Sequence, residues 1–143
     1  MKILVSACLV GVNCKYNGGN NYHPYLVDFL KDHEYITVCP ELLSGMGCPR
    51  NCVEQVNERF IDQFGNDVSD IFVKGVNLAL SKLKDEDIDL VILQSRSPTC
   101  GVNQRYDGSF SGSLINESGL FAKRLKELGY KVIDIKDFKV LGN

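Results

Sequence analysis

Six cysteines are the residues best suited to chemistry in this chain of 143 residues: Cys8, Cys14, Cys39, Cys48, Cys52 and Cys100. No two of them have the Cys-x2-Cys spacing that is typical of zinc ribbons and thioredoxin-type redox pairs. The apolar stretch before Cys8 is too short for the h-region of a secretory signal. We therefore expect a cytoplasmic protein whose thiols are reduced and serve metal binding or catalysis.

Three of the cysteines follow predicted strands. Cys8 follows residues 2–7, Cys39 follows residues 35–38, and Cys100 lies a few residues after 89–94. If these strands are parallel, their carboxyl ends share the edge where open α/β sheets place ligands. Thiolates favour zinc, copper(I) or iron–sulfur clusters. A cubane cluster normally takes four thiolates, so three would leave one iron open as a Lewis acid. The alternative is that each cysteine is a small buried hydrophobe.

Polar residues accompany these cysteines. Glu41 lies two residues after Cys39, where it could move protons beside a partly dry metal site, or be a solvated loop glutamate. Ser97 opens the turn before Cys100 and could either orient a polar substrate or cap that turn. Further candidates for the wall of a binding pocket are Asn13, Tyr16, Arg105 and Tyr106.

Apolar runs of strand length alternate with amphipathic helical patterns, which indicates a mostly parallel sheet covered on both faces. Residues 131–135 predict a fourth strand. Helices are predicted from Pro24 to about Lys31, from Asp67 or Ser69 to about Leu83, and from a Ser118 cap to Gly129. The remaining segments are irregular at 42–54, a weak strand or ribbon at 55–64, and a polar loop at 95–113.

Length and composition fit one globular domain: apolar residues make up 44% of the chain and charged residues 24%. The formal net charge is −2, so the chain has no overall basic field to attract nucleic acid. No apolar run is long enough to cross a membrane. These features favour a small-molecule partner, make tRNA a less favoured one, and exclude a membrane role.

Several motifs together resemble one known family. They occur in order as Ser6-Ala7-Cys8-Leu9 with Gly11, Cys14 to Gly19, Val38 to Glu41, Pro49-Arg50 with Glu54, Ser97 to Gly101, and Tyr106 to Gly112. This pattern resembles the family catalogued as domain of unknown function 523, whose characterised members include thiouracil desulfidases. The resemblance extends from Leu4 to about Val132.

The resemblance implies a 4Fe-4S cluster held by Cys8, Cys39 and Cys100, with a free iron that takes the sulfur of a thiolated pyrimidine. It also implies that Glu41 acts as the acid–base group and that Ser97 positions the substrate. Two features depart from the family pattern: Asn17 replaces a usual aspartate, and Cys48 and Cys52 lie in a segment that usually lacks cysteine. Either cysteine could replace Cys39 as a ligand or add a fourth one.

The sequence thus predicts a single desulfidase-like domain, residues 1–143, with a Rossmann-like three-layer α/β sandwich. The preferred function is the hydrolytic removal of sulfur from 2- or 4-thiouracil, which gives uracil and sulfide, by a monomer or weak homodimer. Water activated by Glu41 would add at the carbon that bears the sulfur. The alternatives are non-enzymatic: an iron–sulfur redox sensor, or a binding module stabilised by zinc.

Overall fold

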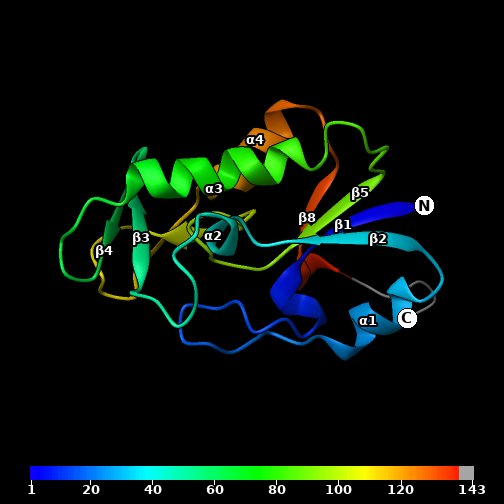
Figure 1. Cartoon of the computed structure of the whole chain (residues 1–143), viewed down its shortest axis with the longest axis horizontal. Coiled ribbons are helices and arrows are strands. Elements are labelled where there is room, and N and C mark those ends of the chain that lie inside the picture. The colour runs from blue at the N-terminus through cyan, green and yellow to red at the C-terminus, as the bar shows by residue number, and fades with distance from the viewer. Residues whose placement is uncertain (139–143) are drawn as a thin grey trace.

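Four parallel strands form the central sheet of this computed structural model, which describes residues 1–138 (Figure 1). They are β1 (Lys2–Ser6), β2 (Glu34–Val38), β5 (Leu90–Leu93) and β8 (Val132–Asp134), in the spatial order β2-β1-β5-β8. The two central strands are apolar over residues 3–5 of β1 and throughout β5, as expected for strands covered on both faces. The predicted strands are therefore confirmed to within one or two residues.

Helices cover both faces of the sheet. On one face, α1 (Pro24–Leu30) and the short 3-10 helix η1 (Ala7–Val10) pack over β1. On the other face, α3 (Ser69–Ser81) and α4 (Leu120–Glu127) enclose the larger core around Phe72 and Phe121 (Figure 1). The predicted α/β class, with a parallel sheet between two helical layers, is confirmed. The expected domain, residues 1–143, extends past the part that the structure describes.

The shorter elements lie beyond the carboxyl edge of the sheet. A hairpin of β3 (Val53–Val56) and β4 (Arg59–Asp62) confirms the predicted ribbon. A second, small hairpin pairs β6 (Arg105–Tyr106) with β7 (Leu114–Ile115), inside and just after the segment expected to be a loop. The 3-10 helix η2 (Ile135–Asp137) ends the described chain. Of these elements, the two hairpins contribute to the wall around the ends of the strands.

Two local expectations differ from the structure. A one-turn helix, α2 (Pro40–Leu43), begins directly after Cys39 and extends into the segment that was expected to be irregular. Ser118 does not cap α4, because Gly119 occupies the N-cap position and the Ser118 hydroxyl donates to the carbonyl of Val102. A Cβ at Gly119 would lie 2.6 Å from the backbone of Thr99, so only glycine fits there. No helix in residues 1–138 has the length and apolarity to cross a bilayer.

Candidate active site

A cavity of about 600 Å³ opens at the carboxyl edge of the sheet, between the strand ends and the two hairpins. Its wall includes five of the six cysteines: Cys8, Cys14, Cys39, Cys52 and Cys100. Cys8 follows β1 and Cys39 follows β2, while Cys100 belongs to the turn after β5. The structure thus brings the three cysteines predicted from strand order to one cavity, and it adds two others.

Cys14 lies between Cys8 and Cys39. Its thiol is buried and lines the same cavity, and its backbone carbonyl accepts from the Cys39 thiol at 3.9 Å. The proximity of the three thiols raises the pKa of Cys14 and lowers the pKa of Cys39 and that of Cys8, the latter to about 7. Two further donors favour the thiolates, because Asn21 Nδ2 lies 3.5 Å from Cys8 Sγ and the N–H of Leu42 lies 3.4 Å from Cys39 Sγ.

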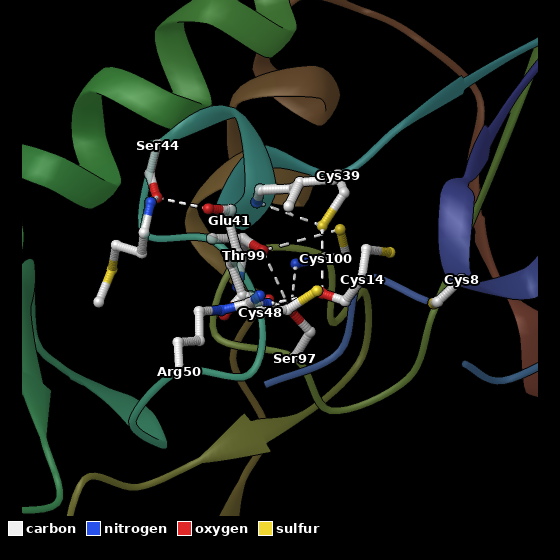
Figure 2. A network of polar contacts seen from close by, with 12 residues as sticks. Cys8, Cys14, Cys39, Glu41, Ser44, Cys48, Arg50, Ser97, Thr99 and Cys100 are labelled. Carbon is white, nitrogen blue, oxygen red and sulfur yellow. Dashed lines mark hydrogen bonds and ion pairs between the residues drawn. The ribbon is translucent and has the colours of Figure 1, made fainter. Parts of the chain in front are cut away.

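The third predicted ligand, Cys100, is held by a tight turn. The Ser97 hydroxyl accepts hydrogen bonds from the N–H groups of Thr99 and Cys100 at 3.1 and 3.0 Å. The Thr99 hydroxyl lies 3.7 Å from Cys100 Sγ. Burial raises the pKa of the Cys100 thiol, so a metal cation would have to stabilise its thiolate. Figure 2 shows this turn beside Cys14 and Cys39, with Cys8 of η1 on the far side of Cys14.

Glu41 is the carboxylate nearest to this group in sequence, and it lines the cavity from the first turn of α2. Its partner is Arg50, whose Nη2 lies 3.6 Å from Glu41 Oε2 (Figure 2). The Arg50 side chain is 3% exposed, and its guanidinium also donates to the carbonyls of Cys14 and Gly47. Burial raises the pKa of Glu41, and the Arg50 charge opposes that rise. Arg50 therefore links the loop of Cys14 and the loop of Gly47 to the carboxylate of Glu41.

The other predicted pocket residues divide into two groups. Tyr16, Tyr106 and Ser97 line the cavity. Asn13 and Arg105 do not: the Asn13 side chain accepts from Asn20, and buried Arg105 is bound to the carbonyl of Gln55 and to Glu117. Those two are not brought to the site.

Cys48 and Cys52, the two cysteines that depart from the family pattern, differ in position. Cys48 is exposed, and its thiol donates to the carbonyl of Asn13 at 2.9 Å, outside the cavity wall. Cys52 is half-buried and lies in the wall. The alternative in which Cys48 takes the place of Cys39 receives no support from this arrangement.

Sequence reasoning missed four residues of the site. It left Cys14 without a role and gave none to Arg50 or Glu54, although all three stand in the motifs quoted above. The fourth residue, Phe110, also lines the cavity, and its backbone φ of 56° lies in the left-handed region. Their positions could not be predicted, because each of these residues lies in a segment whose sequence has no regular periodicity.

The donor set fits an iron–sulfur cluster better than a single ion. Within residues 1–138, no three Cys, His, Asp or Glu side chains are arranged to hold one metal ion. The thiols instead border a cavity with space for a larger group, and soft sulfur ligands are those that iron–sulfur clusters take. The residues present therefore fit a cluster held by thiolates from several loops.

The fold and this site together define an α/β protein with a thiolate-lined cavity at the end of its sheet. The sequence pattern of the 2-thiouracil desulfurase family matches residues 3–137, and the chain belongs to this family. The family membership predicted from the motifs is thus confirmed, and the non-enzymatic alternatives are not favoured.

Two individual relatives extend the comparison. The chain is 34% identical over 141 residues to the uncharacterized protein YbbK of Bacillus subtilis (strain 168), and the alignment covers 92% of this chain and 93% of YbbK. The structure of the present chain is similar to that of the [4Fe-4S]-dependent thiouracil desulfidase TudS (DUF523Vcz), with a TM-score of 0.89 and 29% identity. That similarity covers 96% of this chain and 92% of TudS.

Proposed function

We propose that this protein is a [4Fe-4S]-dependent thiouracil desulfidase that hydrolyses the C–S bond of a thiolated pyrimidine. The observation that carries the proposal is the convergence of Cys8, Cys39 and Cys100 with Glu41 and Ser97 on one cavity. Membership of the 2-thiouracil desulfurase family and the close structural similarity to TudS support the same activity.

Cys8, Cys39 and Cys100 are the proposed ligands of the cluster. Each follows one of three adjacent parallel strands, Cys8 and Cys39 closely and Cys100 in the turn after β5. Cys14 is proposed to stay outside the ligand set because, unlike the other three, it does not follow a strand of the sheet but lies in the loop between η1 and α1. A cluster held by three thiolates supplies a Lewis-acid site for the sulfur of the substrate.

Glu41 is the proposed acid–base group. One of its carboxylate oxygens would take a proton from a water molecule as that water adds to the carbon bearing sulfur. The C–S bond then breaks, and the products are uracil and hydrogen sulfide, with no net oxidation or reduction. The raised pKa of Glu41 suits this role, since a carboxyl group with a pKa closer to neutral both accepts and returns a proton readily.

Ser97 is the proposed group for orienting the substrate. Its oxygen already accepts two backbone N–H bonds, and these polarise the hydroxyl towards donating its own proton. The Ser97 hydroxyl also lies 3.1 Å from that of Thr99, so its proton has two directions available. In the substrate complex, Ser97 Oγ would donate to an acceptor atom of the pyrimidine.

The proposed substrate is a free thiolated base or its nucleoside, in a cytoplasmic enzyme of the hydrolase class. The net charge of −2 supports a small substrate over tRNA. All six cysteines are free, which suits a reducing compartment.

The test is anaerobic cluster reconstitution followed by incubation with 2- and 4-thiouracil. Turnover is followed by loss of thiouracil absorbance and by release of uracil and sulfide in equal amounts. Glu41→Gln should retain the visible absorption of the cluster and lose turnover. Each of the variants Cys8→Ser, Cys39→Ser and Cys100→Ser should lose that absorption. The control variant Cys48→Ser should keep both absorption and turnover. Absence of turnover by the loaded wild-type protein with every thiolated pyrimidine would disprove the function.

A further inference from the structure

A second carboxylate, Glu54, faces the cavity and has no role in the reaction as proposed. It comes from β3, on the hairpin side of the cavity rather than from a sheet strand. The residue is only 7% exposed. Within residues 1–138 it makes no ion pair with a basic side chain. A buried carboxylate without a cation must be stabilised by hydrogen-bond donors.

Only one oxygen of Glu54 has such donors. Glu54 Oε1 accepts the N–H of Gly108 at 3.0 Å and the N–H of Phe110 at 3.2 Å. No donor contacts Oε2 among the described residues, although the side chain belongs to the cavity wall. The second oxygen is thus a free acceptor within the proposed active site.

The two bonds to Oε1 also fix the turn between β6 and β7. Gly108 packs so closely on β3 that a Cβ there would lie 2.2 Å from Val56 Cγ2. Phe110 follows in the left-handed region and contributes to the cavity wall, together with Tyr106 from the same hairpin. Glu54 therefore holds the turn that carries Phe110 at the cavity, and aromatic rings are suitable partners for a planar base.

From this arrangement we propose that Glu54 is a specificity-determining residue whose free oxygen accepts the N3–H of the thiolated pyrimidine. The inference rests on the proposed function and names how its substrate is recognised. N3–H lies between C2 and C4, so it adjoins the sulfur-bearing carbon in both 2- and 4-thiouracil. It is also the ring N–H that remains when N1 carries a sugar. A carboxylate oxygen accepts such a donor strongly, and a ring without this N–H offers it no hydrogen bond.

The charge of Glu54 acts on the space where the substrate would lie. The pKa of the Cys52 thiol is raised, first by burial and then by the negative charges of Glu54 and Glu41. Both carboxylates thus act on one part of the wall. Glu41 is paired with Arg50, whereas Glu54 has no ion pair among the described residues, so the two carboxylates have different surroundings.

The variant Glu54→Gln tests the proposal with little change of shape. Its amide oxygen can keep both bonds to the Gly108–Phe110 turn, while its NH2 group replaces the free acceptor by a donor. The matched control is Glu58→Gln, which changes an exposed glutamate at the end of the same hairpin. Unchanged visible absorption of the cluster and unchanged circular dichroism would show that both variants are folded and loaded.

The measurement compares 2-thiouracil with its 1-methyl and 3-methyl derivatives, using the cluster-loaded protein. For the wild type and Glu58→Gln, we expect 3-methylation to lower kcat/KM by about tenfold to a hundredfold, and 1-methylation to have little effect. For Glu54→Gln, we expect weaker binding of 2-thiouracil and nearly equal kcat/KM for the two methylated compounds. An unchanged preference in Glu54→Gln would overturn the inference and leave the desulfidase function intact.

A binding titration separates this inference from the proposed reaction. Calorimetry with uracil and 3-methyluracil, neither of which carries sulfur, should show preference for uracil in the wild type and loss of that preference in Glu54→Gln. If the preference is present but no thiouracil is turned over, the reaction is wrong and the recognition by Glu54 stands. If uracil and 3-methyluracil bind equally to the wild type, the recognition is wrong.

Discussion

At the scale of single residues, Arg50 is the group on which the site geometry most depends. Its buried guanidinium contacts the Glu41 carboxylate and the carbonyls of Cys14 and Gly47. Arg50→Met would leave these acceptors unpaired, and we expect the free energy of unfolding to fall by about 3 kcal/mol. Chemical denaturation measures this change. The control is Arg59→Met, since the exposed pair of Arg59 and Asp67 should contribute little. Equal losses in both variants would contradict the structural role of Arg50.

Ser97 carries the second residue-scale prediction. Ser97→Ala removes the acceptor of two N–H groups in the turn that holds Cys100, which should cost about 1–3 kcal/mol of stability. If the hydroxyl also orients the substrate, KM will rise or kcat will fall even under conditions where the variant is fully folded. Ser97→Thr keeps the hydroxyl and should restore most of the activity. Full activity of folded Ser97→Ala would leave Ser97 with a structural role alone.

The ability of the sequence to predict single site residues depended on where they stand in the chain. Cys8, Cys39 and Cys100 were predicted to meet because each follows a strand, and parallel strands end at one edge. Cys14 and Glu54 could not be located in this way. Cys14 lies in a loop whose path is fixed by backbone bonds, such as that from the N–H of Lys15 to the carbonyl of Gly19. Glu54 reaches the cavity from a hairpin whose contact with the second hairpin includes its own bonds to Gly108 and Phe110.

At the scale of elements, periodicity predicted the sheet and the longer helices but not α2. A helix of four residues shows no repeat, and its start depends on Cys39, whose sulfur accepts from the N–H of Leu42. The strands β6 and β7 have two residues each, which is also too short for an alternating pattern. The elements that sequence patterns miss are therefore the ones that shape the cavity.

The contact of α2 with α3 gives the element-scale prediction. A Cβ at Gly75 of α3 would lie 2.1 Å from the carbonyl oxygen of Pro40, which is backbone and cannot move aside alone. Gly75→Ala should therefore push α2 away and destabilise the fold by about 1–3 kcal/mol, despite the better helix propensity of alanine. Because α2 carries Glu41, turnover should fall as well. Thermal unfolding and activity measure the two effects.

Asn77→Ala on the exposed face of α3 is the matched control. It introduces alanine into the same helix without touching α2, so neither stability nor turnover should fall. A stable, fully active Gly75→Ala variant would show that the packing of α2 on α3 tolerates the added methyl group.

At the scale of the whole molecule, most of the core lies away from the site, although Cys8 and Cys100 each belong to one of its two clusters. The sheet is packed by fully buried apolar side chains, such as Leu4 and Ile92 in the strands and Phe72 and Phe121 in the helices. The proposed ligands, in contrast, sit on loops beyond the strand ends. The protein should consequently fold without its cluster and then order its loops when the cluster binds.

Removal of the cluster tests this separation. Binding to the folded state alone stabilises that state, so chelation after anaerobic loading should lower the melting temperature. Hydrogen exchange should show where the stability was lost. We expect faster exchange in residues 8–22, 39–52 and 95–104, which carry the thiols, and unchanged protection in β1, β5 and α3. The variant Cys48→Ser should behave as the wild type in both states, because its thiol lies outside the cavity wall. Loss of protection throughout the sheet would mean that the cluster is part of the core, contrary to the packing described above.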